Sequence, residues 1–335
     1  MKTEVGIPVC NALNTLPATL MSLVNQTVHD FEVCLSIDGD EHLNEYLDMA
    51  NNFHACGLNI RTLYTNINQG PGMARQLILD TTEADYIIFL DSDDLLTPRA
   101  VEILTRVMDQ QELDIVRSAY IREEKGALGT IIPQNSASIT HFHGKIYRVS
   151  YLYEKEIFFL PNLRLNEDSY FNLIAWNSTD KRGEVAEPMC IWRENENSIT
   201  RNEGEKAFFI KSYDQYVLSQ VEGLKKLHAI NGEISTSLLA TTLTLIYNNY
   251  MRAKCYDLDT EKLDVIIHTL RDCDFIQKFL NDYNSWVELI KQLRAGEIYD
   301  DVIVFYKEPF SEWANRLIKE KKDADSNKQI ESGNS

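Results

Sequence analysis

The chain has 335 residues, of which 44% are hydrophobic and 10% aromatic, and this content excludes a wholly disordered protein. Lys and Arg number 33 against 51 Asp and Glu, and the resulting net charge of −18 disfavours nucleic acid as a partner but leaves room for a local basic groove. None of the six cysteines forms a CxxC pair, so neither a zinc ribbon nor a redox pair is indicated. Cys10 and Cys34 lie in apolar runs and are expected to be buried.

The beginning of the sequence, residues 1–8, lacks the long apolar stretch of a signal peptide. No segment approaches the roughly 18 uninterrupted apolar residues of a membrane-spanning helix. We therefore expect a cytoplasmic protein without stable membrane insertion.

The first 110 residues alternate between patterns typical of strands and of helices. The expected strands are 4–10, 31–37, 59–64 and 86–90, and the expected helices are 16–25, 43–56, 73–81 and 98–110. An alternating order of this kind predicts a mostly parallel sheet with right-handed crossovers.

The pattern changes twice further along the chain. Short β-like runs at 115–121, 129–132 and 145–149 predict strands added antiparallel to the sheet, followed by a helix at 167–176 and a strand at 189–193. Helical spacing then dominates at 207–227, 235–256, 260–270, 275–295 and 310–321. The expected organisation is an α/β domain over residues 1–204, a helical subdomain over 205–322 and a disordered polar tail over 323–335.

Three acids follow the apolar run from Tyr86 to Leu90. Asp91, Asp93 and Asp94 would repel one another unless a cation lay between them, and oxygen ligands suit Mg²⁺ or Mn²⁺. Ligands of open α/β sheets bind at the carboxyl ends of strands, so a metal-bound nucleotide diphosphate is predicted here. The alternative is that these acids only cap the helix expected near Pro98.

Several separate segments together resemble one enzyme family. They are Pro8-Val-Cys-Asn11, Ser22-Leu-Val-Asn-Gln-Thr27, Ile37-Asp-Gly39, Asn68-Gln-Gly70 with Ala74-Arg75, Asp91-Ser-Asp-Asp94, Gly144-Lys-Ile-Tyr-Arg148 and Asn166-Glu-Asp168. In order and spacing they resemble the family 2 glycosyltransferases of the GT-A fold over about residues 1–200. The resemblance implies a Rossmann-like fold and transfer of a sugar from a nucleotide-diphosphate donor.

The resemblance places the donor nucleotide at the strand ends. It implies that Asp38 accepts a hydrogen bond from the uracil imide and that Pro8, Val9 and Asn11 shape the base pocket. The alternative for Asp38 is an Asp-Gly turn. The same comparison implies nucleotide contacts from Gly70, Arg75, Asp91, Ser92, Arg193 and Ser198, with Arg193 in a closing loop that clamps the diphosphate.

The metal and the catalytic base follow from the same resemblance. Asp93 is implied to be the direct ligand of Mn²⁺ or Mg²⁺, with Asp91 beside it, and the ion stabilises the departing diphosphate. Asp168 is implied to be the base that deprotonates the acceptor hydroxyl, with Glu167 positioning the acceptor or supporting the base. Both acids also suit the first turn of a helix, which is a compatible structural explanation.

Other polar residues leave more than one interpretation open. Arg75 contacts the nucleotide, orders the Asp cluster or is a solvated helix residue. His141 and His143 lie two residues apart on one strand face, a spacing that can bind metal but is more often structural or acceptor-facing. Lys145 and Arg148 are candidates for ordinary strand cations.

Some features depart from the family pattern. Ile37 replaces the usual first acid before Asp38, Gln76 stands where Asn is common, and no Gln-x-x-Arg-Trp segment follows Asp168. The last absence, by resemblance, favours a non-processive enzyme over a processive synthase.

The function that we predict is a metal-dependent inverting glycosyltransferase that uses a nucleotide-diphosphate sugar, with UDP as the expected nucleotide. The alternatives are a non-catalytic nucleotide- or sugar-binding module and a nucleotidyltransferase, although the turn after the first strand lacks the glycines of a phosphate loop. A glycan, lipid-linked sugar, protein or modified nucleobase are all possible acceptors. The helical region is a candidate for acceptor recognition or for contacts in a homo-oligomer.

Overall fold

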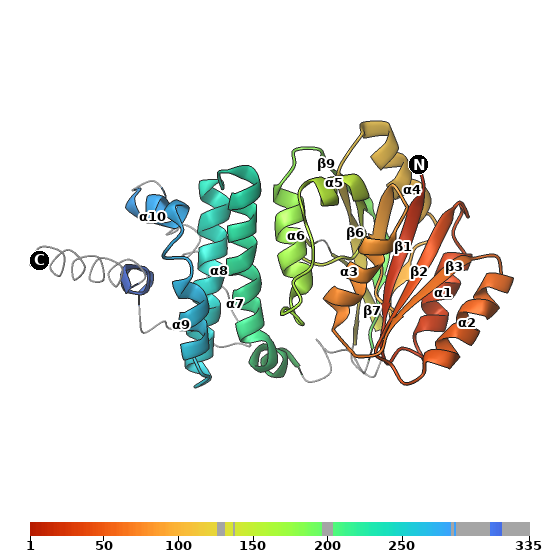
Figure 1. Ribbon diagram of the computed structural model, residues 1–335, viewed down its shortest axis with the longest axis horizontal. Coiled ribbons are helices and arrows are strands. Elements are labelled where there is room, and N and C mark those ends of the chain that lie inside the picture. The colour runs from red at the N-terminus through yellow and green to blue at the C-terminus, as the bar shows by residue number, and fades with distance from the viewer. Residues whose placement is uncertain (126–130, 137, 196–203, 283–284, 286–308, 317–335) are drawn as a thin grey trace, which may run out of the picture. The chain divides into compact units, whose positions relative to one another are not determined.

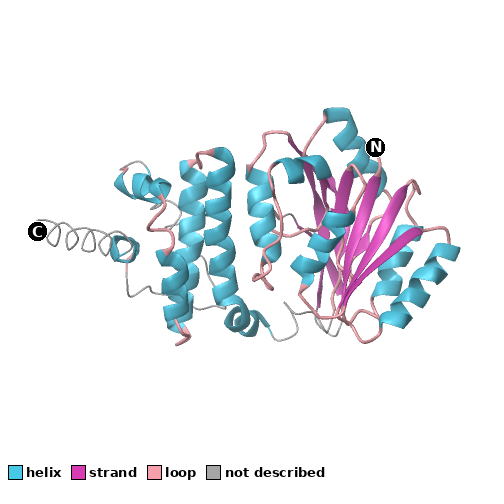
Figure 2. Ribbon diagram, in the orientation of Figure 1, coloured by secondary structure: helices cyan, strands magenta, loops and turns pink. Residues whose placement is uncertain are grey.

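The computed structural model describes residues 1–125, 131–136, 138–195, 204–282, 285 and 309–316 (Figure 1). The chain divides into two compact units, Met1–Asn202 and Glu203–Ser335. The first unit is a sheet with helices on both faces, and the second consists of helices (Figure 2).

Four parallel strands form the first half of the sheet, in the order β3-β2-β1-β4. They are β1 (Thr3–Val9), β2 (Phe31–Asp38), β3 (Asn59–Thr65) and β4 (Tyr86–Phe89). The connecting helices are α1 (Leu16–Val24), α2 (Leu43–Ala55) and α3 (Pro71–Thr81). All of β1 and β4 is buried, as expected for strands covered by helices on both faces, and the predicted parallel sheet is confirmed.

The second half of the sheet has mixed directions. It contains β5 (Leu95–Leu96), β6 (Ile115–Lys125), β7 (Ile131–Ser136), β8 (Lys145–Arg148) and β9 (Arg182–Trp192). Strand β8 pairs antiparallel with β4 and with β6, β7 pairs antiparallel with β6, and β6 pairs parallel with β9. The predicted antiparallel direction is confirmed for β7 and β8, whereas β6 is antiparallel to β8 and so runs in the direction of β4. Residues 129 and 130 of the predicted strand 129–132 lie outside the described residues, and β9 begins seven residues before the predicted start at residue 189.

Helices cover the two faces of this sheet with different side chains. One apolar core joins the sheet to α1, α2 and α4 (Ala100–Gln111). On the other face, aromatic rings from Phe89, Tyr147 and Phe171 pack between the sheet and α6 (Glu167–Asn177), with ring centroids 5.5–6.1 Å apart. A short helix, α5 (Val149–Glu154), directly follows β8. Neither α5 nor the two-residue strand β5 was expected from the sequence.

The second unit is helical, as predicted. Its helices are α7 (Gly204–Asn231), α8 (Thr236–Cys255), α9 (Glu261–His268) and α10 (Asp274–Asn281). Residues 310–316 are also helical, and Trp313, 2% exposed, packs against Tyr247 and Tyr250 of α8 in a separate apolar core. Most of the predicted helix 275–295, the end of 310–321 and the predicted tail lie outside the described residues. In the part that is described, no helix is long and apolar enough to cross a membrane.

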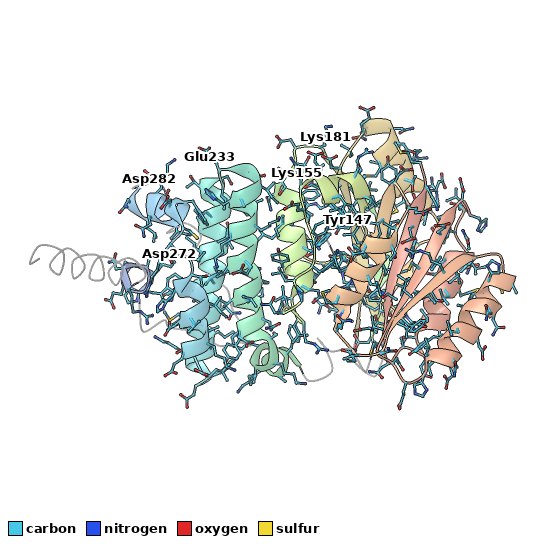
Figure 3. All side chains as sticks on the ribbon, viewed as in Figure 1. Tyr147, Lys155, Lys181, Glu233, Asp272 and Asp282 are labelled. Atoms are coloured by element: carbon cyan, nitrogen blue, oxygen red, sulfur yellow. The ribbon has the colours of Figure 1, made fainter. Side chains whose placement is uncertain are left out.

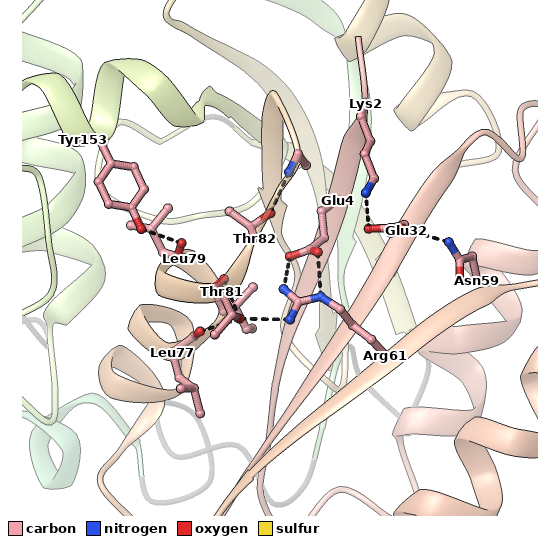
Figure 4. Close-up of polar contacts among 12 residues, drawn as sticks. Lys2, Glu4, Glu32, Asn59, Arg61, Leu77, Leu79, Thr81, Thr82 and Tyr153 are labelled. Carbon is pink, nitrogen blue, oxygen red and sulfur yellow. Dashed lines mark hydrogen bonds and ion pairs between the residues drawn. The ribbon is translucent and has the colours of Figure 1, made fainter.

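A buried ion pair ties the parallel strands together (Figure 4). Glu4 of β1 is fully buried, and its two carboxylate oxygens accept hydrogen bonds from Nη2 and Nε of Arg61 on β3, each at 2.9 Å. Arg61 also donates to Thr81 Oγ1 at the end of α3. The pair therefore spans β2 and fastens a helix end to the sheet, at a position where a lone carboxylate would be costly.

Replacing Arg61 by Met is expected to lower the free energy of unfolding by roughly 3 kcal/mol, because Glu4 is left buried without its cation. Urea unfolding followed by circular dichroism measures this loss. The neighbouring pair Lys2–Glu32 is partly exposed, so Lys2→Met serves as the control and is expected to lower the free energy of unfolding much less than Arg61→Met. Equal losses in the two variants would contradict the importance of burial.

Candidate functional site

The carboxyl ends of β1, β2 and β4 lie at one edge of the sheet because these strands are parallel neighbours. Each is followed by polar residues: Asn11 after β1, Asp38 at the end of β2, and Asp91 after β4. The backbone N–H of Leu90 donates to the carbonyl of Gly6, which carries the β1–β4 pairing up to the aspartate turn. This edge is where the sequence predicted the donor site.

Arg75 joins two of the predicted site segments. Its Nη2 donates to Asp91 Oδ1 at 2.5 Å, its Nη1 donates to Glu167 Oε1 at 2.7 Å, and its guanidinium lies 4.6 Å from the Phe142 ring centre. Only 3% of Arg75 is exposed, which rules out a solvated helix arginine. Burial disfavours the guanidinium charge, but Asp91 and Glu167 outweigh it and raise the pKa of Arg75. Arg75 therefore orders the acidic edge.

Glu167, the first residue of α6, faces Arg75 and not solvent. It is 7% exposed, and the Cβ atom of any residue replacing Gly72 would lie 3.2 Å from its side chain. Burial raises the pKa of Glu167 to about 7, although the Arg75 cation opposes that shift. In this arrangement Glu167 positions Arg75.

Asp168 follows in the first turn of α6, and its Oδ1 accepts from the N–H of Ser169 at 2.7 Å. The fully buried Asn172 holds this helix in place. Asn172 Oδ1 accepts from the hydroxyl of Tyr147 at 2.6 Å, and Nδ2 donates to the carbonyls of Thr140 and Asp168. Figure 3 labels Tyr147 between the sheet and α6. Helix α6, which carries Asp168 in its first turn, is thus hydrogen-bonded to β8.

The turn after β4 is closed by Asp94, which is 1% exposed. Its Oδ1 accepts from the N–H of Arg193 and its Oδ2 pairs with His143 Nε2, each at 2.9 Å. Burial raises the pKa of Asp94 to about 6, despite the opposing effect of His143. Helix α4 starts at Ala100 without a side-chain cap, so the alternative that Asp94 caps this helix is wrong.

Asp93 points to a different partner. Its Oδ2 accepts from Asn195 Nδ2 at 2.8 Å, and burial together with the nearby Asp91 raises its pKa. Among the described residues, a group able to hold a metal ion is formed by Asp91, Asp94 and His143, whose ligand atoms all lie within 4.8 Å of one another. Two carboxylates and an imidazole fit Mn²⁺ and accept Mg²⁺.

The predicted base-pocket residues lie at the ends of β1 and β2. Pro8 and Val9 are buried in β1, while Asn11 has a φ of 52° and donates its N–H to Asp40 Oδ2 at 2.6 Å. The Asp38 carboxylate accepts from the N–H groups of Gln69 and Gly70 and from the hydroxyl of Thr65. Asp38 thus holds the loop after β3, as a turn residue does, and a uracil imide would have to compete for its oxygens.

Three other predicted nucleotide-binding residues have described backbone positions. Gly70 has a φ of 95° and gives its N–H to Asp38, the carbonyl of Ser92 accepts from Thr19 Oγ1, and Arg193 reaches Asp94 through its N–H. Ser198 lies outside the described residues. Cys10, expected to be buried, is exposed and accepts from Asn68 Nδ2 at 3.2 Å, whereas Cys34 is buried as predicted.

Lys145, considered an ordinary strand cation, is fully buried. Its Nζ donates to the carbonyl of His141, in the loop before β8. Burial lowers the pKa of Lys145 to about 7, with Asp168 acting in the opposite direction. The sequence reasoning missed this residue, Asp40 and Asn172. Only the placement of Lys145 in a short apolar strand gave a signal of burial.

The buried amine predicts a pH-dependent stability. Between its native pKa of about 7 and its ordinary value of 10.5, Lys145 binds fewer protons in the native than in the unfolded chain, so stability rises with pH across this window. Relative to Lys145→Met, the wild type is expected to gain about 2 kcal/mol from pH 7 to pH 9. Urea unfolding in EDTA measures this difference. Lys155→Met is the control, because Lys155 is half-exposed. If the difference in free energy of unfolding between wild type and Lys145→Met were as independent of pH as that for Lys155→Met, the effect of burial would be contradicted.

Comparison with known proteins identifies the family. The family model described as glycosyl transferase family 2 matches residues 4–171, which contain the residues of the site described above except Asn172, Arg193 and Asn195.

The chain belongs to the family 2 glycosyltransferases.

Curated relatives of this glycosyltransferase are bacterial. It is 28% identical over 214 residues to the uncharacterized glycosyltransferase EpsJ of Bacillus subtilis, covering 58% of this chain and 61% of EpsJ. It is 22% identical over 246 residues to the poly(ribitol-phosphate) beta-N-acetylglucosaminyltransferase TarS of Staphylococcus aureus, covering 68% of this chain and 41% of TarS. The chain therefore spans less than two thirds of either relative.

Solved structures of TarS share the fold of this glycosyltransferase. One crystal structure of S. aureus TarS superposes with a TM-score of 0.63 at 19% identity, over 95% of this chain and 53% of TarS. A TarS fragment, residues 1–349, in complex with UDP-GlcNAc gives a TM-score of 0.60 at 18% identity, over 92% of this chain and 98% of the fragment. With these coverages the structural similarity includes residues of the helical unit.

Proposed function

We propose that this glycosyltransferase is a metal-dependent, inverting and non-processive enzyme that moves one sugar from a UDP-linked donor to a hydroxyl of a glycan acceptor. The contact that carries the proposal is the Arg75 bridge, because it joins Asp91 at the strand end to Glu167, the neighbour of Asp168. Two relatives are named as poly(ribitol-phosphate) glycosyltransferases, which supports a glycan acceptor. The complex of TarS with UDP-GlcNAc supports a UDP-linked donor. Residues 1–204 would carry the donor site and 205–322 would contribute to acceptor recognition.

The proposed reaction uses Asp168 as the base. Its carboxylate takes the proton of the acceptor hydroxyl as the hydroxyl oxygen forms a bond to the anomeric carbon, and the bond from that carbon to the diphosphate oxygen breaks. A divalent ion held by Asp91 and Asp93 would stabilise the charge on the departing diphosphate as a Lewis acid. Arg75 and Glu167 fix the position of Asp91 relative to the start of α6, and Asn172 stabilises the helix that carries the base.

Release of the nucleotide diphosphate from a panel of nucleotide sugars, with and without Mn²⁺, tests this function without a known acceptor. The expected result is metal-dependent release from a UDP-sugar that is lost in Asp93→Ala. If no donor is hydrolysed, binding of each nucleotide is measured by calorimetry. A chain that binds no nucleotide sugar, with or without Mn²⁺, would contradict the proposal.

A further inference from the structure

The start of α3 and the loop that leads into α6 pack closely against each other. A Cβ atom added at Gly72 would lie 3.2 Å from the side chain of Glu167, and one added at Gly70 would lie 3.5 Å from Arg164 Nε. Gly70 also has a φ of 95°, a conformation that favours glycine. Two segments that are distant in the sequence therefore meet beside the candidate site.

Arg164 supplies polar contacts between these two segments. Its Nη2 donates to the side-chain oxygen of Asn68 and, at 3.4 Å, to the backbone carbonyl of the same residue. The Asn68 amide nitrogen in turn donates to the carbonyl of Asp38 at 3.0 Å and to Cys10 Sγ at 3.2 Å. Asn68 thus connects Arg164 to the ends of β1 and β2, where the nucleotide base is proposed to bind.

The position of Arg164 is closely linked to that of Asp168 along the chain. The preceding residue, Leu163, is 2% exposed and anchors the loop in the protein interior. Only Leu165 and Asn166 separate Arg164 from α6, and Asn166 takes a left-handed φ of 60° where the helix begins. A displacement of Arg164 would therefore displace the first turn of α6, which carries Asp168.

The contact between Arg164 and Asn68 differs from the Arg75 bridge in what it joins. Arg75 is buried and connects the start of α6 to Asp91, in the turn after β4. Arg164 is exposed and connects the same helix start to the ends of β1 and β2. The two arginines together would fix α6 relative to both parts of the proposed donor site.

We propose that Arg164 is a positioning residue for the catalytic base: through Asn68, it aligns Asp168 with the nucleotide bound at the ends of β1 and β2. The inference rests on the proposed function, which assigns the nucleotide and the base. It adds the residue that holds one in place relative to the other. Arg164 acts indirectly, through Asn68 and the backbone.

Hydrogen–deuterium exchange with and without UDP tests this connection without an acceptor. In the wild type, UDP is expected to slow deuterium uptake at residues 163–168, because the occupied pocket stabilises the segment bonded to Arg164. In Arg164→Gln this effect of UDP should be lost, while the dissociation constant of UDP, measured by calorimetry, stays within a few-fold. Arg99→Gln is the matched control, since the Arg99 side chain is 50% exposed and pairs with Glu102 on α4.

Turnover of the donor, measured by nucleotide release, gives a second readout. Arg164→Gln is expected to lower turnover by about 10-fold, because Asp168 is less well placed. In the Asn68→Ala background, Arg164→Gln should lower turnover little further, since both substitutions remove the same bond. A purely structural role of Arg164 would produce neither the separation of turnover from UDP affinity nor this non-additivity.

Several results would overturn the inference while leaving the transferase proposal intact. They are an absence of the UDP effect at 163–168 in the wild type, persistence of that effect in Arg164→Gln, and equal losses of UDP affinity and turnover. No UDP binding by the wild type would instead contradict the proposed function, and the inference with it. If Arg164→Gln fails to fold, Arg164→Lys takes its place, because lysine keeps the charge but lacks the planar group that bonds Asn68.

Discussion

Asp168→Asn is expected to lower sugar transfer by about 10³-fold, because the amide cannot accept the acceptor proton, while general bases contribute about 10² to 10⁴ to such reactions. The substitution keeps the size of the side chain and the oxygen that accepts from Ser169 N–H, so the free energy of unfolding should change little. Turnover is measured with the donor identified by nucleotide release, and donor binding by calorimetry. We expect turnover to fall while the dissociation constant of the donor stays within a few-fold.

The matched control for this substitution is Asp180→Asn. Asp180 is exposed in the turn before β9, and its substitution should leave turnover unchanged. Wild-type turnover in Asp168→Asn would show that another group removes the proton. Equal loss of donor affinity and turnover would instead assign Asp168 to donor binding.

Arg75→Met is expected to reduce both stability and activity. Removing the guanidinium leaves the Asp91 and Glu167 carboxylates without the cation that separates them, and losing one partner of a buried pair costs roughly 3 to 5 kcal/mol. Displacement of the aspartate turn relative to α6 should lower turnover by about 10² or more. Urea unfolding and turnover of the folded fraction measure the two effects separately.

Arg106→Met is the control for Arg75. Arg106 is 49% exposed and pairs with Glu102 at 3.5 Å on α4, where an ion pair between exposed side chains contributes little to stability. If Arg75→Met were as stable and active as Arg106→Met, the bridge would have no organising role. The double variant Arg75→Met with Glu167→Gln removes one of the two unpaired charges. A higher free energy of unfolding in the double variant than in Arg75→Met alone would show that repulsion between Asp91 and Glu167 causes part of the loss.

The parallel half of the fold could be predicted because local sequence patterns determine it. The strand from Tyr86 to Phe89 is buried on both faces and reads as a continuous apolar run, and each crossover helix shows its own periodicity. The two-residue strand β5 has no such pattern. It forms only because Leu95 and Leu96 pair with Ile191 and Cys190, almost a hundred residues later.

The contacts that build the site could not be predicted for a similar reason. Arg75 and Glu167 are 92 residues apart, and His143 and Asp94 are 49 apart, so no spacing in the sequence connects them. Glu167 looked like an acid suited to a helix dipole, yet its surroundings are set by α3. The family resemblance indicated which residues gather at the sheet edge, while burial and partners depend on tertiary packing.

The Asp38 carboxylate has a consequence for the dynamics of the loop after β3. Gln69 and Gly70 lie in a segment without helix or strand, where amide hydrogens usually exchange rapidly with solvent. Both donate to Asp38, at 2.7–3.1 Å, and the carboxylate belongs to a buried strand. Their deuterium uptake should therefore be as slow as that of β2, so this stretch of loop would open only when the central sheet does.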